Sequence, residues 1–109
     1  MRLKSDVLVR AGLRLCAHRA IPVTVVHRGD PDAGAILVKV NRLEHGCTVL
    51  AQAWGATGRA VWLAASGETP VPEEEADALL DRHLSRDPDL WVLEVEDRDG
   101  YNPFAALDV

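Results

Sequence analysis

Four short stretches rich in Val, Ile and Trp follow one another through the first two-thirds of the chain, separated only by short turn-like segments. They span residues 23–28, 35–43, 47–54 and 60–66. β-Branched and aromatic residues favour strands, whereas Gly, Pro and Asp favour turns. Connections this short permit only antiparallel neighbours, because a parallel crossover needs a dozen or more residues. The sequence therefore predicts an antiparallel run of four strands.

Two helices and a fifth strand complete the pattern. Ser5 is expected to cap a first helix that ends near residue 20. Pro72 and the acidic run 73–75 are typical of the first turn of a second helix, and residues 90–96 form a fifth strand. The order α-β-β-β-β-α-β predicts an α+β fold with a five-stranded, mainly antiparallel sheet. We expect one helix on each face of the sheet, and the last strand beside the first.

Length and composition fit a single domain, residues 1–109, of ordinary globular balance. The chain is 48% hydrophobic and 27% charged, and no apolar run approaches the roughly 20 residues of a membrane helix. The charged N-terminal segment lacks the apolar core of a secretory signal, so we expect a cytoplasmic protein. Cys16 and Cys47 are expected to be buried free thiols. The four His residues are scattered, so we expect no metal and no other cofactor.

Charge is distributed unevenly along the chain. Residues 1–59 hold nine Lys and Arg against four Asp and Glu, whereas residues 60–109 hold three against thirteen. Such a split can mark a basic ligand-binding face with an acidic tail. The alternative, which we favour in a single domain without a linker, is that the two halves pack together and neutralise each other.

The hairpin turns predict which side chains share a face of the sheet. One face is expected to be apolar throughout: Val23, Val25, Ile36, Val38, Val40, Val49, Ala51, Ala53, Trp62 and Ala64. The other, which we call the mixed face, centres on Lys39 beside Gln52, with apolar neighbours at Leu37, Leu50, Trp54 and Leu63. A lysine at the centre of a sheet is rarely fully buried without a partner.

Three arrangements could cover Lys39. The second helix could cross the mixed face and bring Asp77 or Asp81 to the ammonium. A second subunit could pack there and make a homodimer. Alternatively, the mixed face could be a binding surface on which Trp54 supplies contact area and basic residues supply positive charge.

Motifs for catalysis are missing from the sequence, and we assign no catalytic residue. No Gly-x-Ser-x-Gly elbow or phosphate-binding loop occurs. Glu94 and Glu96 lie on one face of the last strand, and we expect them on an exposed edge, where charge blocks the addition of further strands. The chain is acidic overall and has one Tyr and one Phe, so a protein partner is favoured over nucleic acid.

Short segments at 1–6, 28–34, 38–43 and 87–92 together resemble domain-of-unknown-function family 1491, a group of small alphaproteobacterial proteins. The resemblance covers nearly the whole chain. It implies a bacterial cytoplasmic protein and carries no activity, cofactor or site with it.

The favoured hypothesis is therefore a non-enzymatic binding or protein-interaction module that uses the mixed face, with self-association as one form of it. The alternatives are a small enzyme or anionic-ligand binder and an RNA- or DNA-associated factor. The candidate ligand- or partner-binding residues are Arg28, Lys39, Asn41, Arg42, Gln52, Trp54 and Arg59.

Overall fold

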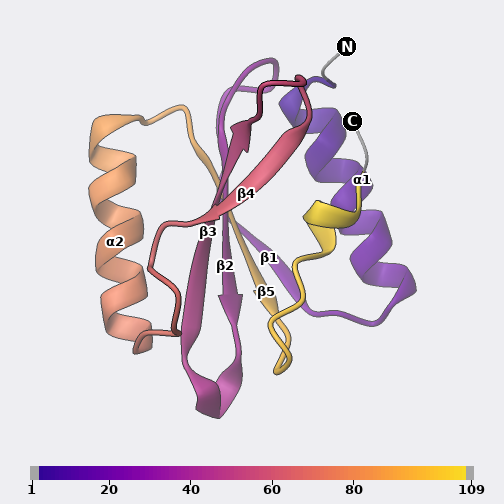
Figure 1. The fold of residues 1–109 in the computed structure, drawn as a ribbon. Coiled ribbons are helices and arrows are strands. Elements are labelled where there is room, and N and C mark those ends of the chain that lie inside the picture. Colours follow the sequence, from indigo (N-terminus) through magenta and orange to yellow (C-terminus); the bar gives the residue numbers. More distant parts are fainter. Residues whose placement is uncertain (1–2, 108–109) are drawn as a thin grey trace.

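A computed structural model describes residues 3–107 and places a five-stranded sheet between two helical layers (Figure 1). Met1 and Arg2, part of the segment that supports the family resemblance, lie outside the described residues. The helices are α1 (Ser5–His18) and α2 (Glu73–Arg86), with short 3-10 helices η1 (Leu43–His45) and η2 (Pro103–Ala106). The strands are β1 (Val23–His27), β2 (Ile36–Asn41), β3 (Cys47–Trp54), β4 (Ala60–Ala64) and β5 (Trp91–Glu96).

The sheet has the strand order β1-β5-β2-β3-β4. β2 and β5 run parallel, and every other neighbouring pair is antiparallel. The α+β class, the mainly antiparallel sheet and the pairing of the last strand with the first are therefore confirmed. The expected hairpin between β1 and β2 is wrong, because β5 inserts between them.

The segment between β1 and β2 passes around the start of β5 instead of closing a hairpin. The Asp30 amide donates to the Asp89 carbonyl at 3.0 Å, and the Trp91 indole Nε1 donates to the Asp30 carbonyl at 2.8 Å. A methyl group on Gly29 or Gly34 would run into the Asp89 carbonyl. Glycine at both positions therefore allows the two backbones to approach this closely.

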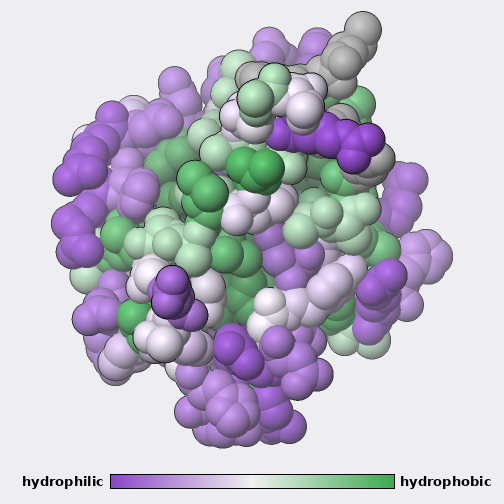
Figure 2. Space-filling model, in the orientation of Figure 1, coloured by the Kyte–Doolittle hydropathy of each residue, from purple (hydrophilic) through white to green (hydrophobic). Residues whose placement is uncertain are grey.

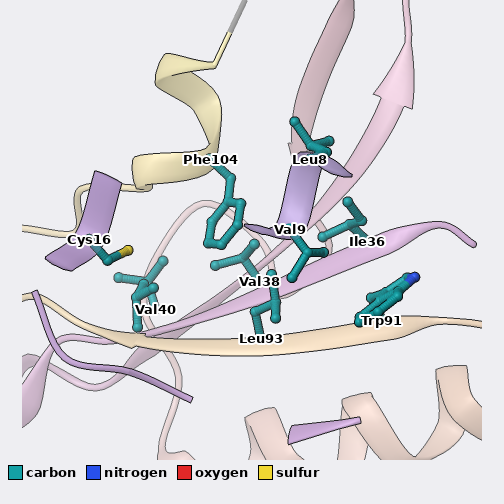
Figure 3. Packing of buried hydrophobic residues seen from close by; sticks show 10 residues of the cluster. Leu8, Val9, Cys16, Ile36, Val38, Val40, Trp91, Leu93 and Phe104 are labelled. Carbon is teal, nitrogen blue, oxygen red and sulfur yellow. The ribbon is translucent and has the colours of Figure 1, made fainter. Parts of the chain in front are cut away.

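β5 begins in the apolar run 90–93, which is buried on both faces of the sheet and explains the central position of the strand. Trp91 and Leu93 join the core beneath α1 (Figure 3). Val95 belongs to the same core, and Val92 joins the core beneath α2. A strand buried on both faces reads as a continuous apolar run. The expectation that Glu94 and Glu96 lie on a strand at the sheet edge is therefore wrong, because β5 is an interior strand, although Glu96 at its end is exposed.

One helical layer covers each face of the sheet, as expected. α1 and η2 cover one face, with Leu8, Val9 and Phe104 buried in that core, and α2 covers the other (Figures 1 and 3). Cys16 and Cys47 are buried free thiols, which confirms that expectation. Ser5 is the first residue of α1 and not its cap, and its hydroxyl donates to the Gly34 carbonyl at 2.6 Å.

The contact between α1 and η2 generates a stability prediction. Gly12 lies in the middle of α1, and a methyl group there would overlap the Phe104 ring. Alanine at an exposed helix position normally gains about 1 kcal/mol over glycine. We expect Gly12→Ala instead to lower the free energy of unfolding by about 1–3 kcal/mol through overpacking, as measured by urea denaturation. Adding Phe104→Leu should recover part of that loss, and a stabilised Gly12→Ala single variant would contradict the packing.

Candidate functional site

Lys39, the centre of the expected site, is buried in an ion cluster. Its side chain is 3% exposed at the middle of β2. From α2, Glu73 Oε2 and Asp77 Oδ1 lie 2.8 and 2.7 Å from Lys39 Nζ. From β5, Glu94 Oε1 lies 3.4 Å away. Asn41, two residues along β2, donates from Nδ2 to the second Glu94 oxygen at 3.4 Å.

The cluster keeps Lys39 charged. Burial alone would lower the pKa of the ammonium, because it disfavours the charged form. The hydrogen bonds that Lys39 donates to Asp77 and Glu73, with the nearby charge of Glu94, outweigh burial and raise the pKa well above its usual 10.5. The buried charge is therefore paired with carboxylates, as such groups require.

Of the three arrangements that the sequence left open, the structure shows the first: α2 crosses over Lys39, and Asp77, one of the two aspartates considered, meets the ammonium. α2 occupies the position that a second subunit or an open binding surface would have taken. A lysine held by three carboxylates, two of them from the covering helix, positions α2 on the sheet. We assign Lys39 this structural role.

Lys39 and Gln52 do not lie side by side as the expected register placed them. Asn41 pairs with Cys47 in place of Leu50, a displacement of three residues. An odd displacement turns every side chain of β3 to the opposite face of the sheet. Its cause is the turn, which spans residues 42–46 and contains η1, in place of a two-residue connection at 45–46. The expected pairing of β3 with β4 is also one residue off, since Gln52 faces Trp62.

Gln52 and Trp54 therefore belong to the α1 side of the sheet. They line a cleft of about 300 Å³ at the N-terminal end of α1, where Ser5, Leu8 and Gly34 form other parts of the wall. The structure brings these two expected site residues together and separates them from Lys39 by the thickness of the sheet.

The remaining basic residues of the expected site lie apart from one another. The Arg28 guanidinium stacks 5.5 Å from the centre of the Trp91 ring, on the α1 side. Arg42 Nε donates to the Arg98 carbonyl at 3.1 Å, beyond the end of β2. Arg59 is exposed just before β4. With Lys39 buried under α2, these residues do not form one basic surface.

Within residues 3–107, no group of three or more His, Cys, Asp or Glu side chains could hold a metal ion. No helix in that range is long and apolar enough to cross a membrane.

A different feature, the free edge of β4, emerges from the sheet topology. β4 is the last strand in the sheet order, and within residues 3–107 it pairs only with β3. The bonds Gly55 N to Arg59 O (2.9 Å) and Ala65 N to Val49 O (2.8 Å) mark hydrogen-bonded positions at the two ends of this ladder. Antiparallel ladders alternate in steps of two. The backbone groups of Val61 and Leu63 therefore face β3, whereas those of Ala60, Trp62 and Ala64 face away from it.

The side chains along this edge are apolar. Val61 and Leu63 are 40% and 57% exposed. Both lie on the face of the sheet that α2 covers, but at the edge of that face, away from the interior strands beneath the helix. Figure 2 shows apolar residues gathered over β4 and in the strip between β4 and α2. Beside the strip, a groove of about 330 Å³ is lined by Leu79 and Glu75 of α2, among others. We call residues 60–64 with this strip the β4 edge.

The opposite edge of the sheet is built differently. β1 contains an irregularity between Val25 and His27, where the register with β5 shifts. Bulges, prolines and charges are the usual means of blocking strand addition at an edge. Residues 60–64 contain no proline and no charged side chain. Sequence reasoning missed the β4 edge, although this uncharged run in a terminal strand of the expected meander was a usable signal.

Comparison with known proteins identifies relatives over almost the whole chain. A family model described as a protein of unknown function, DUF1491, matches residues 3–105. A crystal structure of a DUF1491 family protein from Caulobacter crescentus CB15 is 36% identical with a TM-score of 0.81, covering 94% of each chain. An NMR structure of a DUF1491 family protein from the same organism is 36% identical with a TM-score of 0.79, and the match covers 94% of this chain and 93% of that one.

A solution structure of an A. tumefaciens protein is also similar, at 30% identity and a TM-score of 0.71 over 88% of this chain and 86% of that one. No curated protein matches. The resemblance drawn from the four short segments is confirmed.

The ion cluster predicts an asymmetry between removing the lysine and removing its partners. Replacing both Glu73 and Asp77 by Ala leaves a buried ammonium with Glu94 alone, so we expect a loss of about 3 kcal/mol of unfolding free energy. Lys39→Met removes the buried charge and leaves three carboxylates: Glu73 and Asp77 are about half exposed and can turn to water, and Glu94 is 31% exposed and keeps its contact with Asn41. We expect a cost of less than about 1 kcal/mol. The matched control is Glu74→Ala with Asp81→Ala, which removes equal charge from the exposed side of α2. Equal losses from the double variant and its control would contradict the structural role of the cluster.

The raised pKa of Lys39 predicts a pH dependence at the alkaline end. Because the folded-state pKa lies above the unfolded value, the added stability is fully present below the usual lysine pKa of 10.5 and is lost as pH rises above it. The difference in unfolding free energy between the wild-type chain and Lys39→Met should therefore be constant at neutral pH and shift against the wild type above 10.5. Chemical denaturation at a series of pH values measures it, and an unchanged difference would show that the ammonium is unpaired.

Proposed function

The chain belongs to the DUF1491 family, and for this member we propose a non-enzymatic role in the bacterial cytoplasm as a protein-interaction module whose binding site is the β4 edge. The observation that carries this proposal is a strand edge with outward backbone groups and exposed apolar side chains, free of the usual blocking devices. Such an edge can accept an extended segment of a partner as an additional strand.

In this mode of binding, backbone and side chains contribute differently. The amide and carbonyl groups of Ala60 and Trp62 supply hydrogen bonds to the incoming strand, whatever its sequence. Among residues 3–107, no group outside β3 hydrogen-bonds to these two backbones. Alternate side chains of the partner then lie over Val61 and Leu63, beside the groove along α2. Specificity would come from that apolar strip.

Three side chains that could perform chemistry, Lys39 and the two cysteines, are buried, which supports the non-enzymatic part of the proposal. Lys39 is held by its three carboxylates. Burial raises the pKa of both the Cys16 and Cys47 thiols, which disfavours the reactive thiolate. The basic residues of the anionic-ligand and nucleic-acid alternatives are dispersed over the molecule, so both alternatives receive less support.

Selection from a displayed library of extended peptides tests the proposal. The immobilised wild-type chain is the target, and the Leu63→Lys variant is the counter-target. We expect enriched peptides with alternating apolar residues and no proline at positions that face β4. They should bind Leu63→Lys at least about tenfold more weakly than the wild type, measured by fluorescence anisotropy.

The matched control is Val26→Lys, which changes an exposed valine on the opposite, irregular edge. Peptide affinity should be the same for this variant and the wild type. If no peptide is enriched, or if Leu63→Lys and Val26→Lys weaken binding equally, the β4 edge is not the binding site.

A further inference from the structure

We infer that the partner strand at the β4 edge is the β4 strand of a second copy of this chain, paired antiparallel about a twofold axis that passes through Trp62. This inference rests on the proposed function, since it specifies the occupant of the same edge. Four properties of the edge support it: the spacing of its backbone groups, its side chains, its charges and the edges that remain after pairing.

The outward backbone groups suit self-pairing. Antiparallel strands require an outward residue on one strand to meet an outward residue on the other. The outward set, Ala60, Trp62 and Ala64, is symmetric about its middle member. With a twofold axis at Trp62, that residue meets its own copy and Ala60 meets Ala64 of the second copy. Every outward residue of the strand is then paired.

The same axis brings the exposed apolar side chains together. Val61 of each copy falls opposite Leu63 of the other, in a non-hydrogen-bonded pair with the Cα atoms about 4.5 Å apart. These two residues are 40% and 57% exposed in the single chain. Their four side chains would form one apolar cluster between the two α2 helices. Apolar cross-strand pairs of this kind stabilise a sheet.

Charge at the edge is compatible with a second copy. No charged side chain lies between Arg59 and Glu68, and the axis places Arg59 opposite Ala65 of the other copy, so no like charges meet along the strands. The groove beside the strip is lined by Glu75 and, almost two turns further along α2, by Arg82. The flank beside the edge therefore carries both signs of charge.

Pairing two copies also leaves fewer free edges than binding a single strand. A lone extended segment would present its own outer edge to solvent. Two copies joined at β4 form one continuous sheet whose two remaining edges are both β1. Those edges carry the irregularity between Val25 and His27 that hinders further addition. The assembly therefore closes as a dimer and does not extend into a fibre.

Sedimentation equilibrium over a wide concentration range tests the inference directly. We expect a reversible dimer of the wild-type chain, and we expect Val61→Lys or Leu63→Glu to raise its dissociation constant by about tenfold or more. Val26→Lys, on the β1 edge, is the matched control and should leave the dimer unchanged. Circular dichroism and thermal melting confirm that each variant is folded, since both edge positions are partly exposed in the single chain.

Mixing two edge variants tests the register. Val61→Lys and Leu63→Glu each weaken the homodimer, but in the mixture the introduced ammonium of one copy lies opposite the introduced carboxylate of the other. We therefore expect the mixture to form a heterodimer more tightly than either variant forms a homodimer. A mixture no tighter than the two variants alone would overturn the twofold at Trp62.

The outcomes separate this inference from the proposed function. A wild-type chain that is monomeric at all concentrations, or a dimer that Val61→Lys and Leu63→Glu leave intact, would overturn the second copy as occupant. In either case, peptides that still require Leu63 for binding would preserve the β4 edge as a site for another partner. Loss of both the dimer and the peptide selection would remove the proposed function as well.

Discussion

A strand that begins with an apolar run buried on both faces has to lie inside a sheet with a layer on each side, and β5 imposes this constraint here. Trp91 and Leu93 need the cover of α1, and Val92 needs the cover of α2. The rest of the arrangement follows from that requirement. β1 and β2 are held two strand spacings apart, and the loop between them approaches the start of β5 closely enough to require Gly29 and Gly34.

The position of β5 also determines which carboxylates surround the buried Lys39 ammonium. Because β5 runs parallel to β2, Glu94 comes to lie directly beside Lys39. α2 then completes the charge balance with Glu73 and Asp77, whose carboxylates remain about half exposed. The mixed face, which the sequence favoured as the binding surface, is consequently covered around Lys39, and the exposed apolar surface lies at the β4 edge.

Sequence reasoning recovered what local patterns encode. The helices, the five strands and the buried thiols follow from periodicity and turn residues. The cost of an unpaired buried lysine led to a carboxylate of the second helix, Asp77 or Asp81, as one of three alternatives. The strand order did not follow, because a six-residue connection can close a hairpin or pass around a third strand. The uninterrupted apolar run 90–93 was the sign of an interior strand.

The predicted register of β3 was wrong because of one turn, at residues 42–46. Asn41 accepts a hydrogen bond from the Leu43 amide at 2.9 Å, and Leu43 adopts a left-handed conformation with φ of 59°. Leucine rarely occupies that region, so the sequence favoured a shorter turn at His45 and Gly46. The displaced register moved Gln52 and Trp54 to the wrong face, and with them most of the expected site.

The insertion of β5 between β1 and β2 also bears on the order in which the chain can fold during synthesis. In the described part of the chain, β5 is the only strand beside β1, and some 60 residues separate the two in the sequence. Non-local pairing of this kind forms late, because the chain loses the entropy of closing a long loop before the new contacts stabilise it. A nascent chain that has emerged from the ribosome only as far as α2 has both helices available and a three-stranded β2-β3-β4 meander, but no place for β1. Completion of the fold therefore waits for the last strand, and until then the partly built sheet carries an unfilled edge at β2 as well as at β4.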